Sequence, residues 1–279
     1  MSIGSTWMRA FRHKLVVVAL LLGAVAMLFP LLWMLLLSLK LYPQRFGSLW
    51  ELIQAPVTVQ NYLDIWISDN FARYFANSFL VAGTTAVGNV LLCTLSAYAL
   101  ARKTFVGKRW VFASILLVMM VPPHVLMIPL YRLMVAFHWL NTYWALIVPW
   151  LITPFGIFLM KQYIDQLPME LEDAARLDGA SEWQILWRIV FPLSKPMLVV
   201  LGLYVFLSQW NAFLFPFLFA SDLAHRTLPV GLAFYFGKQS IDWGHLMAGA
   251  ALSALPVLLL LLFFQRHIVQ AMIAGALKE

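Results

Sequence analysis

Half of the acidic residues of this chain lie in one segment, residues 161–195. They are Asp165, Glu170, Glu172, Asp173, Asp178 and Glu182. Carboxylates can act as general acids and bases or as metal ligands, but no HExxH or GxSxG motif accompanies these. The histidines His124, His138 and His245 are scattered, which favours packing or interfacial roles over metal binding. The acidic cluster therefore indicates either a solvated surface or a site that pairs with a basic partner.

The same segment is predicted to fold as two short helices separated by a glycine turn. Pro168 fits the first turn of a helix, and the acids that follow it lie near the positive end of the helix dipole. Gly179 is expected to end this helix, because glycine adopts the left-handed conformation there without steric cost. Ser181 and Gln184 form a capping-box pattern for a second helix, which runs to Pro192.

This helical pair has two interpretations. It is either a surface connection between neighbouring segments or a docking element for another protein. Ala174 and Ala175 are small enough to allow close approach of a partner, and the flanking acids could pair with a basic groove. The residues alone leave both interpretations open.

No nucleotide-binding loop is found in the sequence. Gly107-Lys108 is followed by Arg109 and lacks the upstream glycine of the G-x-x-x-x-G-K-[ST] motif. We therefore predict no ATPase activity, no other catalysis and no cofactor in this chain. Any energy-requiring process in which it takes part must draw that energy from another subunit.

The composition is that of a polytopic membrane protein. Of the 279 residues, 63% are hydrophobic and 11% are charged, and the mean hydropathy is +0.84. Soluble domains average about 45–50% apolar and about 25% charged residues, so soluble, disordered and fibrous classes are excluded. The net charge of +7 comes from short basic clusters between apolar stretches, which fits membrane orientation rather than nucleic-acid binding. The single cysteine, Cys93, is expected to be a buried, inert thiol.

Six apolar stretches are long enough to cross a bilayer, which takes about 20 residues per helix. They cover residues 15–39, 74–101, 110–135, 139–160, 196–220 and 244–265. The first is too long for a signal peptide and no cleavage site follows it, so it is predicted to be a permanent helix. Charged residues are missing from the central parts of the spans, which argues against a proton-driven transporter or a charged-ring channel.

The predicted organisation is an N-terminal tail at 1–14, a six-span domain at 15–270 and a C-terminal tail at 271–279. Loop 161–195 joins spans four and five. Most of the nineteen Lys and Arg residues lie in the loops on the side of the two tails, so both termini are predicted to be cytoplasmic.

Polar side chains within the spans are few, and four are candidates for contact with a solute. Asn77 lies in the second span, and Gln209, Trp210 and Asn211 adjoin one another in the fifth. Hydrogen-bonding groups beside an aromatic ring commonly recognise sugars. Hydrogen bonding between helices is the alternative and explains the same residues.

The acidic loop resembles the EAA loop of ATP-binding-cassette importer permeases, whose pattern is Glu-Ala-Ala, three residues, Gly, nine residues and Ile-x-Leu-Pro. In this chain it reads Asp173-Ala174-Ala175, three residues, Gly179, nine residues and Ile189-Val190-Phe191-Pro192. Asp173 replaces the glutamate, with Glu172 beside it, and Phe191 replaces the leucine. The spacing is kept in full, and the loop falls on the predicted cytoplasmic side.

Further segments resemble the sugar-importer branch of this family, of the maltose-permease type, over almost the whole chain. They are Ala76-Asn77-Ser78-Phe79, Ser96-Ala97-Tyr98-Ala99, Leu177-Asp178-Gly179-Ala180, Gln209-Trp210-Asn211 and Gln265-Arg266-His267-Ile268-Val269-Gln270.

The resemblance implies an all-helical type I importer permease of the bacterial cytoplasmic (inner) membrane. It implies a heterodimer with a sister permease, two ATPase subunits that bind ATP and Mg, and an extracytoplasmic solute-binding protein. Loops 40–73 and 221–243 would then face the binding protein. ATPase docking is expected at Glu172, Asp173, Ala174, Ala175, Asp178, Gly179, Ile189 and Pro192.

The expected solute is a sugar or oligosaccharide, neutral or acidic. A glycerol-phosphate-type solute is the alternative within the same branch. An ATP-independent facilitator and a membrane scaffold are the rivals outside it, and the uncharged spans and the EAA spacing argue against both.

Overall fold

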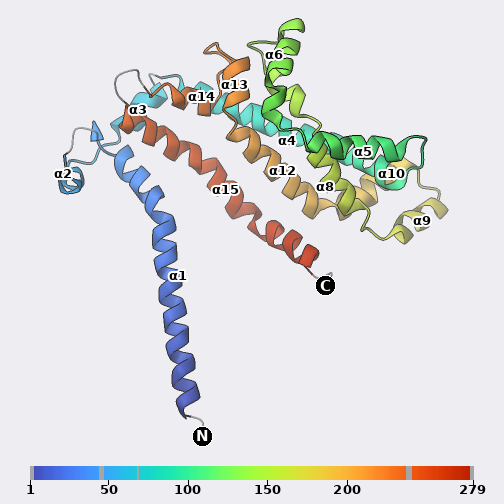
Figure 1. The fold of residues 1–279 in the computed structure, drawn as a ribbon, viewed down its shortest axis with the longest axis horizontal. Helices are drawn as coiled ribbons and strands as arrows, with labels where there is room; N and C mark the ends of the chain where they lie inside the picture. Colours follow the sequence, from blue (N-terminus) through green and yellow to red (C-terminus); the bar gives the residue numbers. More distant parts are fainter. Residues whose placement is uncertain (1–2, 44–46, 68, 237–240, 277–279) are drawn as a thin grey trace. The chain divides into compact units, whose positions relative to one another are not determined.

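The computed structural model describes residues 3–43, 47–67, 69–236 and 241–276 (Figure 1). Regular structure in these residues is helical, apart from an isolated antiparallel bridge between Phe236 and Ile241. The predicted all-α class is confirmed. The chain divides into two compact units, one of residues 1–71 and 234–254 and the other of residues 72–233 and 255–279.

The helices follow one another along the chain as α-helices, labelled α, and 3₁₀- or π-helical segments, labelled η. They are α1 (Ile3–Ser38), α2 (Leu49–Gln54), α3 (Gln60–Ile67), α4 (Phe71–Arg102), α5 (Lys108–Met119), η2 (Pro123–Leu126), α6 (Met127–Ala136), α7 (Tyr143–Ile147), η3 (Val148–Trp150), α8 (Pro154–Ile164), α9 (Met169–Leu177), α10 (Glu182–Ile185), η4 (Leu186–Val190), α11 (Phe191–Leu193), α12 (Lys195–Trp210), α13 (Leu214–Phe219), α14 (Leu228–Ala233) and α15 (Trp243–Ala276).

Four helical segments of the described chain are long and apolar enough to cross a membrane. They are Lys14–Ser38, Phe71–Arg102, Tyr143–Ile164 and Trp243–Gln265. Two further pairs meet the same criterion but are bent: α5 with η2–α6 by 95°, and α10–α11 with α12 by 76°. The chain therefore has six spans if each bent pair crosses once. The predicted span 110–135 is bent, because the chain turns sharply within it.

Prolines explain where the predicted spans break. Pro122 and Pro123 lack the backbone N–H that a continuing helix needs, and each disfavours a helical conformation in the residue before it. The predicted fifth span, 196–220, is also interrupted, since α12 ends at Trp210 and α13 begins at Leu214. Pro216 then lies in the first turn of α13, where its missing N–H costs nothing.

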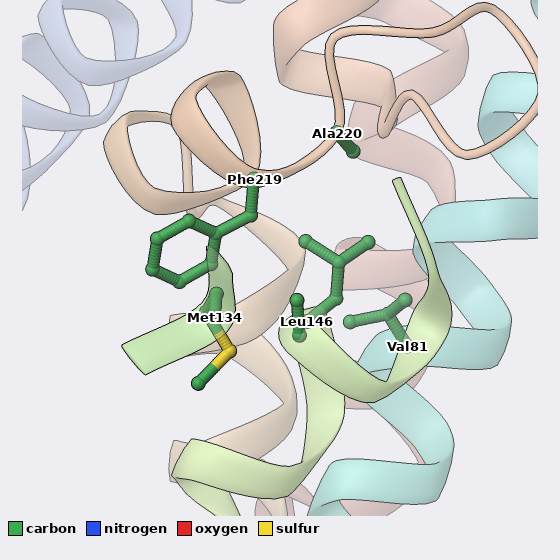
Figure 2. Packing of buried hydrophobic residues seen from close by; sticks show 6 residues of the cluster. Val81, Met134, Leu146, Phe219 and Ala220 are labelled. Atoms are coloured by element: carbon green, nitrogen blue, oxygen red, sulfur yellow. The ribbon is translucent and has the colours of Figure 1, made fainter. Parts of the chain in front are cut away.

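A hydrophobic cluster in the second unit joins α4 to α6, α7 and α13. Figure 2 shows it from close by, and its members are Val81, Met134, Ala145, Leu146, Phe219 and Ala220. Asn141 fixes the adjoining turn, because its N–H donates to the Phe219 carbonyl (2.7 Å) and its side-chain oxygen accepts from the Ser221 N–H (2.8 Å). The cluster therefore holds together helices that are far apart in sequence.

Helix α4 also binds the turn that begins α8. The Asn89 amide donates to the Trp150 carbonyl (2.9 Å), and the Thr153 N–H donates to Cys93 Sγ (3.5 Å). A Cβ atom at Gly156 would lie 2.8 Å from the same sulfur, so the approach requires glycine. Cys93 is buried, as predicted. Helix α8 in turn packs against α5 and α12. Because α8 precedes α9 and α12 follows α11 in the chain, this packing positions both ends of the segment that contains α9 and α10.

In the first unit, buried polar groups attach Ile53, Ala55 and Asn61 to the chain at the end of α1. The Lys40 ammonium is buried and donates to the carbonyls of Ile53 and Ala55. The Asn61 amide donates to the carbonyls of Ser38 (2.8 Å) and Lys40 (3.0 Å). Lys40 therefore organises its loop and is not a free surface charge.

Candidate docking site

Helix α9 ends at Leu177, and Gly179 makes the turn that terminates it, as the sequence predicts. The Gly179 N–H donates to the Arg176 carbonyl (3.0 Å) and the Ala180 N–H to the Ala175 carbonyl (2.9 Å), which together make a Schellman ending. Gly179 has φ +82°, in the left-handed region. A Cβ at this position would meet no atom within 4 Å, so glycine is required by the backbone angle and not by lack of space.

The second helix of the pair begins with the predicted capping box. Ser181 Oγ accepts from the Gln184 N–H (3.4 Å), and Gln184 Oε1 accepts from the Ser181 N–H (2.7 Å). Helix α10 continues through the π-helical segment η4 into α11, which contains Pro192. The predicted arrangement of helix, glycine turn and helix is therefore present as local structure.

Helix α9 presents an exposed stripe that mixes acidic, small and apolar side chains. Met169, Asp173 and Leu177 follow one another at four-residue spacing and are exposed, and Ala174 lies beside them. The Asp173 side chain is 60% exposed, and Leu177 is 90% exposed. Sequence reasoning missed Leu177, because single exposed leucines are common on protein surfaces and give no signal of their own.

Glu172 faces the opposite way from Asp173 and is buried. Its Oε1 lies 2.7 Å from Nε of Arg102, the last residue of α4. The side chains of Glu172 and Arg102 are 1% and 6% exposed, and Arg102 Nη2 also donates to the Leu167 carbonyl (2.9 Å). Of the two acids at the motif's first position, Asp173 is thus available to a partner, whereas Glu172 is used within the chain.

Glu182 forms a second, more exposed link between the helical pair and the C-terminal end of α4. Its carboxylate lies 2.6 Å from Lys103 Nζ and accepts a hydrogen bond from the Tyr98 hydroxyl (2.7 Å). These contacts lower the pKa of the Glu182 carboxyl to about 2, so it is ionised at neutral pH. Arg176 contacts Glu182, Glu172 and Asp173 and connects the two links.

A hollow of about 310 Å³ lies between the end of α9 and the second helix. Gly179 and Ala180 line it from the turn, and Ile189 and Arg188 from η4. Ile189 is half-buried in its wall, and Pro192 is exposed further along. The structure thus brings the predicted docking residues Ala175, Asp178, Gly179 and Ile189 around one concave surface.

Asn77, predicted to contact solute, is buried and fully engaged by its own chain. Its amide donates to the carbonyls of Ala224 (2.8 Å) and Arg226 (2.9 Å), and its side-chain oxygen accepts from the Tyr143 hydroxyl (2.7 Å). These bonds attach the segment before α14 to α4. Asn77 therefore has the structural role, hydrogen bonding within the protein, that the sequence analysis gave as the alternative to solute contact.

We expect Asn77→Ala to lower the free energy of unfolding by about 1–3 kcal/mol, because buried carbonyls lose their donor. Thermal unfolding of the purified protein would measure it. Asn211→Ala is the matched control, since Asn211 is exposed and donates only to the Leu207 carbonyl one turn away. If Asn77→Ala left the stability unchanged but altered which solute is transported, the structural role of Asn77 would be contradicted.

The other three pathway candidates lie together at the end of α12. Trp210 is 2% exposed, stacks on Phe206 with ring centroids 5.7 Å apart and meets Phe75 edge-on at 5.4 Å. Gln209 is half-buried and Asn211 is exposed. Their contact with a solute stays a prediction.

These features define a helical membrane protein with several candidate spans and an ordered helical pair. The family described as "Binding-protein-dependent transport system inner membrane component" matches residues 89–274. The chain belongs to this family. It is therefore a membrane component of a transport system that works with a binding protein, as the resemblance implied, and not a member of a catalytic class.

Two relatives are similar over nearly their whole length. The trehalose/maltose transport system permease protein MalG of Thermococcus litoralis is 35% identical over 273 residues, 96% of this chain and 97% of that protein. The arabinooligosaccharides transport system permease protein AraQ of Halalkalibacterium halodurans is 33% identical over 253 residues, 90% and 91% of the two chains.

A solved structure has the same fold. It is the crystal structure of a bacterial ABC transporter involved in the import of the acidic polysaccharide alginate, with a TM-score of 0.81 at 23% identity. The match covers 92% of this chain and 97% of the other. The importer-permease fold predicted from the EAA pattern is confirmed.

Proposed function

We propose that this chain pairs with a sister permease to form the membrane pathway of a sugar or oligosaccharide importer. Two separate ATPase subunits, which bind ATP and Mg, drive it, and an extracytoplasmic binding protein delivers the solute. The observation that carries the proposal is the α9 stripe, where Asp173, Ala174 and Leu177 are exposed beside a rigid glycine ending. A partner that covers Leu177 would remove its apolar surface from water, which favours docking.

The proposed solute class rests on the relatives. Their names describe transport of trehalose, maltose and arabinooligosaccharides, and both relatives match at least 90% of this chain. Gln209 and Asn211 remain our candidates for solute contact, because their side chains are not buried. A glycerol phosphate is the alternative solute.

The proposed mechanism is alternating access. ATP binding closes the ATPase dimer, α9 moves with the ATPase surface on which it docks, and the spans switch from inward-facing to outward-facing. The solute then passes from the binding protein to the cavity, and ATP hydrolysis restores the inward-facing state. This requires α9 and both termini to lie on the cytoplasmic side of the inner membrane, as the distribution of basic residues favours.

The decisive experiment measures ATPase activity of the co-purified complex in lipid, with its binding protein and a panel of solutes. The panel contains neutral oligosaccharides, uronate oligosaccharides and glycerol phosphates. Stimulation by one class supports the importer and identifies the solute. If no ATPase co-purifies and no solute stimulates activity, the facilitator and scaffold alternatives return.

We expect Leu177→Asp to weaken ATPase association by at least about tenfold, because burying a leucine contributes about 1.5–3 kcal/mol. Retention of the ATPase during affinity purification measures it. Leu223→Asp is the matched control, since Leu223 is also exposed but lies in the predicted outer loop 221–243. Equal retention in both variants would remove Leu177 from the docking surface.

A further inference from the structure

Among the ion pairs of the described residues, Arg102–Glu172 is the one in which both side chains are buried. The remaining pairs each have at least one partner more than 10% exposed, including Lys103–Glu182, with side chains 37% and 49% exposed. Exposed pairs exchange with water at little cost and hold their partners loosely. A buried pair cannot separate without leaving an unpaired charge away from water, so the two structural elements that bear its side chains stay together.

The pair joins two elements that are far apart in the sequence. Arg102 is the last residue of α4, which is long and apolar enough to be a span, and Glu172 lies in the first turn of α9. The guanidinium holds α9 at two points, because it contacts the Glu172 carboxylate and also the Leu167 carbonyl just before the helix.

Burial also decides what Glu172 can do. With 1% of its side chain exposed, it presents no surface to a partner, whereas its neighbour Asp173 is 60% exposed. The side of α9 that carries Asp173 and Leu177 is therefore free for docking, while the side that carries Glu172 is fixed to α4.

We propose that the Arg102–Glu172 ion pair makes α9 and the end of α4 move as one body, so that displacement of α9 is transferred directly to this span. Glu172 and Arg102 are then positioning residues for transport coupling and make no contact with the ATPase. This inference rests on the proposed function, in which α9 docks on an ATPase. Without the pair, the segment between α8 and α9 would absorb the displacement.

The test compares Glu172→Gln with Glu182→Gln in the complete complex with its ATPase and binding protein. The same substitution is made twice in the same helical pair, once at the buried link and once at the exposed one. We expect Glu172→Gln to reduce solute transported per ATP hydrolysed at least about tenfold in the complex that still assembles. Glu182→Gln is expected to keep the wild-type ratio.

A merely structural role would lower the amount of complex without changing this ratio. If Glu172→Gln does not assemble, Arg102→Met/Glu172→Met replaces it, because removing both charges leaves none unpaired. Arg102→Cys/Glu172→Cys in a Cys93→Ala background provides the rescue, since a short bismaleimide then joins α4 to α9 without the ion pair. We expect the unlinked variants to be uncoupled and the cross-linked one to recover.

The outcomes separate the two proposals. If the wild-type complex shows no binding-protein-stimulated ATPase activity, the proposed function fails. If the wild type is stimulated but the variants without the ion pair keep its transport-to-ATP ratio, or the cross-link restores nothing, then α4 and α9 are not coupled through Arg102–Glu172.

Discussion

Gly179→Val is expected to abolish solute transport and binding-protein-stimulated ATPase activity. Valine at φ +82° is strained by about 1–2 kcal/mol, and its β-branch makes the left-handed conformation especially unfavourable. The chain relieves the strain by abandoning the two hydrogen bonds that end α9. The exposed stripe then loses its fixed relation to the hollow beside it, and docking fails.

Two variants separate this effect from general instability. Gly179→Asn should keep much of the activity, because asparagine tolerates the left-handed region better than other residues with a side chain. Gly107→Val carries the same strain at φ +83° but lies before α5, outside the proposed docking surface. ATPase assays of the reconstituted complexes would compare all three. Full transport by Gly179→Val would exclude the proposed role of this turn.

Trp210→Ala is expected to have the largest effect on stability. Trp210 is buried against Phe206 and Phe75, and large-to-alanine changes at such positions cost about 3–5 kcal/mol. We expect a value of about 3 kcal/mol, the lower end of this range. Lipid is as apolar as a protein interior, so the variant loses mainly packing contacts and little free energy of transfer from water. Thermal unfolding in detergent and the yield of folded protein measure it.

Trp210→Phe distinguishes packing from solute binding. Phenylalanine keeps an aromatic ring beside Phe206 and Phe75, so we expect a much smaller loss of stability and an unchanged preference among the solutes of the panel. A folded Trp210→Phe variant that prefers a different solute would instead support the predicted contact with sugar and overrule the packing role.

The local conformation of the docking loop could be read from the residues because it is set by short-range chemistry. Gly179 and the Ser181–Gln184 capping box each act within four residues of chain, and each has the predicted effect. Pro168 lies one residue earlier than predicted, at the N-cap of α9 and not in its first turn. The break at Pro122-Pro123 follows from equally local rules. Both prolines lie inside the predicted span 110–135, where each can kink the helix.

The burial of Glu172 could not be read in this way. Glu172 and Asp173 are adjacent and chemically alike, and no sequence pattern indicates which of them faces α4. The partner, Arg102, is 70 positions away and looks like an ordinary basic residue at the end of a span. Asn77 is a similar case, because its partners near residue 225 come close only when the second unit folds.

The sequence by itself determined the membrane class, the helical pair and the relation to importer permeases, because hydropathy, capping and motif spacing are properties of contiguous residues. The tertiary structure alone decided which polar residues are exposed and which hold the chain together. That choice depends on side chains brought together from distant segments, where a buried charge or amide is stable only if the fold supplies its partner.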